Sequence, residues 1–183
     1  MLNSWFYLQA LDLCVCMPAK CGGTAFYLTA FKLGDIDTRH ARSAVERLAS
    51  QSGQGPYSPE EITEYYSDKP KLLGVRHPVE RFRSLWRDKC RDGDVNMPML
   101  NGWDPSTLIE HITQYPTGNG HWMPQYLYRV PGCKVVDCRR MLHTLGFENA
   151  VVNATNPSEG DPDMPTADIL RHYSRDYDLW RMV

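Results

Sequence analysis

A glycine-rich turn near the start of the chain limits its possible folds more than any other segment: Met17-Pro18-Ala19-Lys20-Cys21-Gly22-Gly23-Thr24. It follows Leu11 to Met17, which has the character of a buried β-strand, and precedes Thr24 to Leu33, which has helical periodicity. A strand that passes through such a turn into a helix presents backbone N–H groups and the positive end of the helix dipole at one point, and Lys20 adds a full charge. The segment predicts a site for one phosphate-sized anion, with a simple tight turn as the alternative.

The turn differs from the nucleotide-binding loop G-x-x-x-x-G-K-[ST], in which the lysine follows the second glycine. Here Lys20 precedes Gly22 and Gly23, and Thr24 opens the helix. No aspartate after a strand is evident as a Mg²⁺ ligand either. A small-molecule kinase of the P-loop type is therefore the less favoured enzyme class.

Short apolar runs alternate with helical segments along the chain, which predicts an α/β fold with a short parallel sheet flanked by helices. Ser58, Pro59 and Glu61 have the spacing of a capping box with proline at the first helical position. Further strands are expected at 71–76 and 134–136, and helices at 24–33, 41–50, 58–66, 139–145, from His77-Pro78, from Asp104-Pro105, and from a capping Thr166 through Trp180. At 183 residues, we expect a single domain spanning 1–183.

A second candidate segment begins at Arg76, which ends the predicted strand 71–76. Ligands in open α/β sheets bind at this edge, so a strand-end arginine must either pair or bind an anion. Ser84 lies eight residues on, about two turns into the next helix. The two side chains could therefore converge on a second phosphate.

The same helix carries further basic residues, which we interpret as a solvated face. They would pair with nearby carboxylates of the same helix, Glu80 and Asp88. The residues concerned are Arg81, Arg83, Arg87 and Lys89.

These two segments together resemble the PAPS-dependent sulfotransferases, in particular the carbohydrate sulfotransferases. In that family a Pro-Lys-Thr-Gly-Gly-Thr-like loop holds the 5′-phosphosulfate of 3′-phosphoadenosine 5′-phosphosulfate (PAPS), and an arginine with a serine eight residues later holds its 3′-phosphate. The resemblance implies a P-loop-like three-layer fold that uses PAPS, releases adenosine 3′,5′-bisphosphate (PAP) and needs no metal. The donor-binding residues that it implies are Lys20, Cys21, Gly22, Gly23, Thr24, Ala25, Arg76 and Ser84.

Two further stretches agree with that family. His121-Trp122-Met123-Pro124-Gln125 looks like its His-Trp-x-Pro-Gln block, and 152–155 with Tyr173-Ser174-Arg175-Asp176-Tyr177 looks like its C-terminal pattern. The chain departs from the family at three positions. Ala19 replaces the usual proline, Cys21 a hydroxyl residue, and His77 an aspartate or asparagine.

Transfer of a sulfuryl group to an alcohol leaves new negative charge on the departing phosphate oxygen, which Lys20 would stabilise. The acceptor hydroxyl must also lose a proton to a base near neutral pH. His40 and His121 are the candidates, and an ordinary structural histidine is an equal alternative for each. The resemblance implies a carbohydrate or other small hydroxyl compound as acceptor. The alternative to an enzyme is a relative that binds nucleotide without catalysis.

The charge balance, 20 basic against 22 acidic residues, argues against a nucleic-acid partner. No apolar stretch approaches the roughly 20 residues of a spanning helix, and no signal peptide is evident, so we expect a cytoplasmic protein without membrane insertion. The six cysteines lack metal-ligand spacing and are expected as free thiols.

Overall fold

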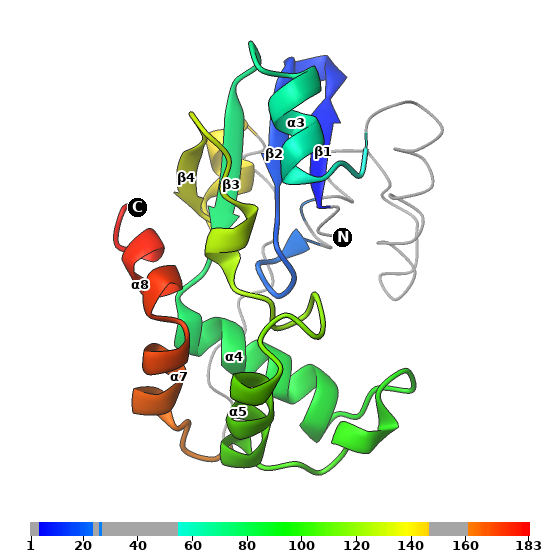
Figure 1. Ribbon diagram of the computed structural model, residues 1–183, viewed down its shortest axis with the longest axis vertical. Coiled ribbons are helices and arrows are strands. Elements are labelled where there is room, and N and C mark those ends of the chain that lie inside the picture. The colour runs from blue at the N-terminus through cyan, green and yellow to red at the C-terminus, as the bar shows by residue number, and fades with distance from the viewer. Residues whose placement is uncertain (1–3, 24–25, 27–54, 147–160) are drawn as a thin grey trace.

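The computed structural model describes residues 4–23, 26, 55–146 and 161–183, and its centre is a four-stranded sheet (Figure 1). The strand order is β1 (Trp5–Leu8), β2 (Leu13–Cys16), β3 (Lys71–Val75) and β4 (Lys134–Asp137). β2, β3 and β4 are parallel, and β1 pairs antiparallel with β2. The predicted α/β fold is confirmed, and β1 adds an edge strand that the sequence pattern did not reveal.

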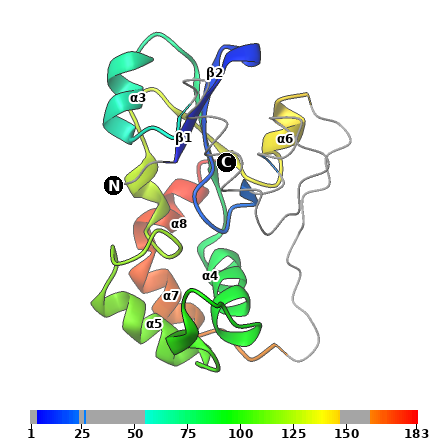
Figure 2. The same ribbon diagram turned by 90° about the vertical axis from the view of Figure 1, so that its right-hand side faces the viewer.

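Both faces of the sheet are covered, which explains why the central strands lack polar alternation. Along β2, Leu13 and Val15 pack into one apolar cluster, while Cys14 and Cys16 pack into another on the opposite face. Figure 2 shows α3 (Pro59–Tyr65) on one side of the strands and α6 (Met141–Thr144) on the other. This is the three-layer arrangement that the resemblance implied.

A third apolar cluster lies beyond the carboxyl ends of the parallel strands (Figure 1). It joins α4 (Pro78–Trp86), α5 (Pro105–Gln114) and α7 (Thr166–His172). The predicted apolar face of α5 is confirmed, because Leu108 and Ile112 are fully buried. The carboxyl edge of the sheet thus faces a layer of helices.

Local signals at the helix starts were reliable. The Ser58 side chain accepts from the Glu61 N–H, and Glu61 accepts from the Ser58 N–H, so the capping box before α3 is confirmed. Asp104 accepts from two N–H groups at the start of α5. His77 caps α4 with Nδ1, which accepts from the Val79 N–H at 3.3 Å. His77 thereby performs the capping role for which aspartate or asparagine is usually chosen.

Several expected boundaries were wrong. β2 begins at Leu13 because Gln9–Leu11 form a 3₁₀ turn, η1, that ends in left-handed Asp12. The last predicted helix is two helices, α7 and α8 (Ser174–Trp180), with a break at Tyr173. The N-cap of α7 is Pro165, while the Thr166 hydroxyl donates to the Met164 carbonyl. The predicted helices at 24–33 and 41–50 lie outside the described residues, apart from Phe26.

Three short helices complete the described part of the fold. η2 (Arg87–Arg91) extends α4 as a π-helix, and η3 (Pro98–Leu100) precedes α5. η4 (Gln125–Tyr128) lies between α5 and β4 along the chain. η2 and η4 matter most for function, because each contributes side chains to the carboxyl edge of the sheet.

Candidate functional site

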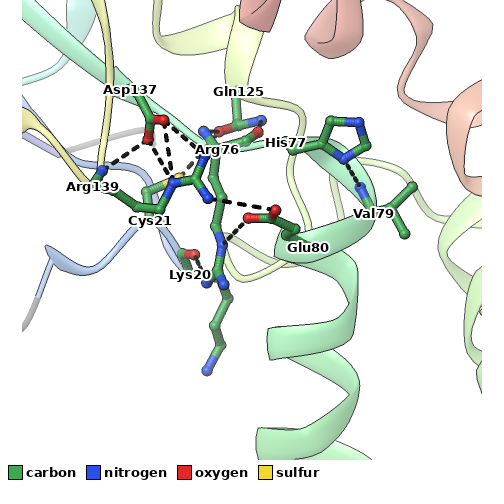
Figure 3. A network of polar contacts seen from close by, with 9 residues as sticks. All are labelled: Lys20, Cys21, Arg76, His77, Val79, Glu80, Gln125, Asp137 and Arg139. Atoms are coloured by element: carbon green, nitrogen blue, oxygen red, sulfur yellow. Dashed lines mark hydrogen bonds and ion pairs between the residues drawn. The ribbon is translucent and has the colours of Figure 1, made fainter. Parts of the chain in front are cut away.

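The candidate site lies where the three parallel strands end (Figure 3). Lys20 follows β2, Arg76 follows β3 directly, and Asp137 ends β4. Parallel strands bring their carboxyl ends to one edge, so segments far apart in the sequence meet here. The predicted placement of Arg76 at a strand end is confirmed.

The glycine-rich turn has a left-handed backbone at two positions. Lys20 has φ of 66° and Gly22 has φ of 79°. The Cys21 N–H donates to the Pro18 carbonyl, and the Phe26 N–H donates to the Gly22 carbonyl, so a tight turn leads into a helical turn. A left-handed conformation is uncommon for a residue other than glycine and is typical of functional loops. Gly22 directly precedes Gly23, which has helical backbone, and N–H groups at the start of a helix have no earlier carbonyl to bind.

Arg76 connects the two segments that the sequence singled out. Its side chain is buried, and Nη1 donates to the Lys20 carbonyl oxygen at 3.1 Å. Its Nε lies 3.6 Å from Oε2 of Glu80, which also lies near Arg139. The guanidinium therefore faces both the turn and the first helical turn of α4.

Gln125 holds the backbone of Arg76 in place and is itself completely buried. Its Oε1 accepts from the Arg76 N–H at 2.8 Å, and its Nε2 donates to the Arg76 carbonyl at 2.9 Å. The Cys21 thiol donates to the same Oε1 at 3.1 Å. One carboxamide thus couples the turn after β2 to the end of β3 (Figure 3).

Asp176 explains why the C-terminal motif accompanies the block that contains Gln125. Its carboxylate accepts from the N–H groups of Gln125 and Tyr126, at 2.8 and 2.9 Å. The Tyr173 hydroxyl donates to the Trp122 carbonyl at 2.6 Å. The break between α7 and α8 lies beside these two contacts, so both motif residues hold the segment 122–126 from one side.

Arg81 joins the same network, and its interpretation as part of a solvated face was wrong. It is 3% exposed, and it donates to the carbonyls of Ala19 at 3.0 Å and Met123 at 2.8 Å. Its Nη1 lies 3.9 Å from Asp176. Arg81 therefore ties the glycine-rich turn to the His-Trp-x-Pro-Gln block.

Two other basic residues of that supposed face are buried as well. Arg87 pairs with Asp161, and Lys89 pairs with Asp88 and Asp94. Asp161 lies 74 residues from Arg87 in sequence, and Asp94 lies five residues after Lys89, beyond the end of the helix, so a helical pattern alone cannot show these ion pairs. Of the four residues, Arg83 is half-buried.

Lys20 extends from the turn and forms an ion pair with Asp88 of η2. Burial lowers the pKa of Lys20 by more than the neighbouring Asp88 raises it. Burial would raise the pKa of Asp88, but the Lys20 and Lys89 ammonium groups together outweigh it and the pKa falls. Ser84 is half-buried and lies one helical turn before Asp88, so it is on the side of the helix that Lys20 reaches.

The remaining predicted site residues are placed as follows. His121 is half-buried, and its N–H donates to Asn119 while its carbonyl accepts from Arg81. His40, Thr24 and Ala25 lie outside the described residues, as does the segment 152–155. The base therefore stays a prediction.

The sequence identified Gln125 and Asp176 as members of the two motifs but indicated no role for either residue. It also gave no indication that Asp88 pairs with Lys20. The sequence signal for this contact was the joint occurrence of the two motifs. Gln125 and Asp176, which share a hydrogen bond, lie 51 residues apart. A buried amide next to a buried carboxylate is the physical reason for that joint occurrence.

The fold and the site define an α/β protein with an anion-binding edge built from a glycine-rich turn and a strand-end arginine. A family model described as the sulfotransferase family matches residues 16–171, from the end of β2 through most of α7. The chain therefore belongs to the sulfotransferase family and is a transferase of sulfuryl groups. No curated protein and no solved structure matches it. None of the helices within the described residues is long and apolar enough to cross a membrane.

Proposed function

We propose that the chain transfers a sulfuryl group from PAPS to a hydroxyl group of a small-molecule acceptor, a carbohydrate in particular. The observation that carries this proposal is the contact between the Arg76 guanidinium and the Lys20 carbonyl at the carboxyl edge of the sheet. It joins the turn that carries Lys20 to the strand end that carries Arg76, and a donor with two anionic groups requires cationic residues at both places. The likeness of 121–125 to the carbohydrate sulfotransferase block supports the acceptor class.

The described residues fit such a donor. Lys20 and Gly22 adopt a left-handed backbone, which is typical of loops whose N–H groups bind anions, and this suits a phosphosulfate. Arg76 is buried beside this turn with its Nη1 already ordered, which suits a phosphate. Ser84 lies two turns into α4 and would share that second phosphate.

PAPS, when bound, supplies an activated sulfuryl group with phosphate as its leaving group. The Lys20 ammonium would neutralise the charge that develops on the departing oxygen. To do so it must exchange Asp88 for that oxygen, because the two now form an ion pair. Gln125 and Arg81 hold the turn and Arg76 in a fixed geometry, so little reorganisation is needed at the moment of transfer.

An acceptor hydroxyl must lose a proton as its oxygen bonds to sulfur. His121 and His40 are the proposed bases, with His121 in the block whose backbone Arg81 holds. Loss of transfer with donor affinity unchanged in either His→Ala variant would assign the base.

Thermal stability in the presence of nucleotides tests the donor class. PAP should raise the melting temperature, and ATP with Mg²⁺ should not. A rise in melting temperature with ATP and Mg²⁺ but not with PAP would favour a kinase and overturn the proposal.

Turnover separates an enzyme from a binding relative. Lys20→Ala should abolish transfer of label from PAPS to a panel of sugar and alcohol acceptors. Lys134→Ala, a change at an exposed lysine of β4, is the matched control and should transfer normally. Equal activity of the two variants would refute the role of Lys20.

A further inference from the structure

A groove beside the candidate site has no role in the donor binding described above. It lies in the helical layer that Figure 1 shows beyond the carboxyl ends of the strands, between η2 and the segment that leads into α5. Its volume is about 580 Å³, which falls within the roughly 300 to 1,000 Å³ of small-molecule sites. Pro162, from a segment distant in sequence, completes its lining. The groove is therefore large enough for a small organic ligand.

Hydrogen bonds join the two walls of this groove. The Trp86 indole N–H donates to the Trp103 carbonyl at 2.8 Å, and the Gly102 N–H donates to the Cys90 carbonyl at 2.8 Å. Trp86 and Cys90 are buried, so they form the base of the groove rather than its rim. A groove whose walls are already joined needs little ordering when a ligand binds.

The groove begins about one helical turn from Asp88, the partner of Lys20. Arg91 and Asp92 line the groove and follow Asp88 by three and four residues. Residues at these spacings are neighbours on a helix surface, with Cβ atoms roughly 5–6 Å apart. A ligand in the groove would therefore lie next to the carboxylate that holds the Lys20 ammonium.

Polar contacts connect Asp88 to the other wall as well. The Lys89 Nζ lies 2.9 Å from Asp88 and also pairs with Asp94. The Asp94 N–H donates to Oδ1 of Asn101 at 3.2 Å, and Asn101 lines the groove. Both walls thus connect to the carboxylate that holds Lys20.

The lining combines an aromatic surface with a polar rim. Trp103 is half-buried, and its ring centroid lies 5.3 Å from that of His111 at an interplanar angle of 75°. Asn101 is exposed, so its carboxamide can donate and accept hydrogen bonds. One face of a sugar ring consists of C–H bonds that pack against an aromatic ring, while its hydroxyl groups need polar partners. The groove offers both kinds of contact.

The charges in the groove disfavour an acidic ligand. Among the described residues that line it, Asp92 and Asp104 carry carboxylates and Arg91 carries the one positive charge. The Arg91 guanidinium already pairs with Asp92 at 2.6 Å and with Asp161 at 3.0 Å. A uronic acid or an already sulfated sugar would meet like charge here, which weakens binding. A neutral sugar would not.

We propose that this groove is the acceptor site and that it binds a neutral sugar, with the sugar ring against Trp103 and its hydroxyl groups near Asn101. This inference rests on the proposed function, because it places the acceptor beside a donor bound at Lys20. One hydroxyl oxygen of the sugar would bond to sulfur as the bond between sulfur and the phosphate oxygen breaks, and the hydroxyl proton would pass to the base.

Saturation-transfer NMR on the native protein, with and without PAP, tests sugar binding without turnover. The neutral probes are lactose, cellobiose and N,N′-diacetylchitobiose, and the acidic probe is an unsulfated chondroitin disaccharide, which contains a uronic acid. We expect transfer from the protein to the ring protons of at least one neutral probe, and none to the acidic probe. No transfer to any neutral probe, or stronger transfer to the acidic one, would overturn the proposal.

Substitution of Trp103 tests where the sugar binds. Trp103→Ala should lose the saturation transfer and raise the acceptor KM by about tenfold or more, while the affinity for PAP stays within about twofold of the native value. Tyr65→Ala, at an exposed aromatic residue of α3, is the matched control and should bind sugar and PAP as the native protein does. Equal sugar binding by the two variants would contradict the role of Trp103.

Pro162→Trp provides the same test if circular dichroism shows that Trp103→Ala does not fold. Pro162 is exposed and lines the groove, so an indole at this position should fill the groove and leave Trp103 in place. This variant should lose sugar binding and retain PAP binding. Native sugar binding by folded Pro162→Trp would overturn the proposal.

PAP titration distinguishes failure of this inference from failure of the proposed function. A native protein that binds PAP, and whose sugar binding is unchanged by both groove substitutions, would refute the acceptor groove and retain the proposed function. Failure of the native protein to bind PAP would instead count against the proposed function.

Discussion

Lys20 and Asp88 form an ion pair that joins the glycine-rich turn to η2. Asp88 is also 2.9 Å from the Lys89 ammonium, which in turn pairs with Asp94. The proposed catalytic ammonium is therefore held by a carboxylate that an anionic donor must displace. Binding of the donor and pairing with Asp88 thus compete for the Lys20 Nζ.

Asp88→Asn should tighten PAP binding by roughly two- to fivefold, because partly exposed ion pairs contribute up to about 1 kcal/mol. Calorimetric titration measures the change. Asp92→Asn, at an exposed carboxylate that pairs with Arg91, is the matched control and should bind as the native protein does. Weaker binding in Asp88→Asn would mean that Asp88 positions the ammonium rather than competing for it.

Gln125→Ala should weaken PAP binding by about tenfold, because the backbone of Arg76 loses both of its carboxamide contacts. The titration is performed on protein shown by circular dichroism to be folded. Gln114→Ala, at an exposed glutamine that ends α5, should leave affinity unchanged. Native affinity in folded Gln125→Ala would show that Arg76 does not depend on Gln125.

Asp176→Ala should lower the free energy of unfolding by about 3–5 kcal/mol, because it leaves the buried Arg81 guanidinium and two N–H groups without their carboxylate. Urea denaturation measures the loss. Asp178→Ala, two residues on and exposed, should change stability by less than about 0.5 kcal/mol. Similar stability of the two variants would contradict the structural role of Asp176.

The carboxylate of Asp137 should make stability depend on pH. Burial would raise its pKa, but the side chain and N–H of Arg139 outweigh burial and hold the pKa below the ordinary 3.8. A carboxyl group with a lowered pKa in the folded state stabilises fully above 3.8, and this contribution is lost as pH falls through the folded value. Asp137→Asn should therefore show a smaller loss of unfolding free energy than the native protein as pH falls below 3.8. Identical slopes would refute this assignment.

Local sequence signals accounted for much of the fold. Ser58 and Glu61 marked the start of α3, and Arg76 could be placed because strand ends and helix starts follow from backbone chemistry. β1 was missed because its residues, Trp5–Leu8, are almost all buried and show no alternation. An edge strand of this kind is identified by its pairing with the neighbouring strand, and its own sequence pattern does not predict it.

The supporting network of the site could not be predicted from local patterns. Arg81 has the appearance of a surface residue on a helical wheel, yet its partners lie 62 and 42 residues away. Asp176 and Gln125 likewise meet across 51 residues. Such contacts depend on how helices pack over the sheet edge, so only the motif resemblance hinted at them.

Calorimetric titration of PAP into the native protein, Arg76→Ala and Arg140→Ala tests the central claim most directly. The native protein should bind PAP, and Arg76→Ala should bind it about 10- to 100-fold more weakly, as expected for loss of a charge-assisted contact. Arg140→Ala, an exposed arginine beside the same sheet edge, should bind normally. Equal affinity of the two folded variants, or no binding of PAP by the native protein, would contradict the account.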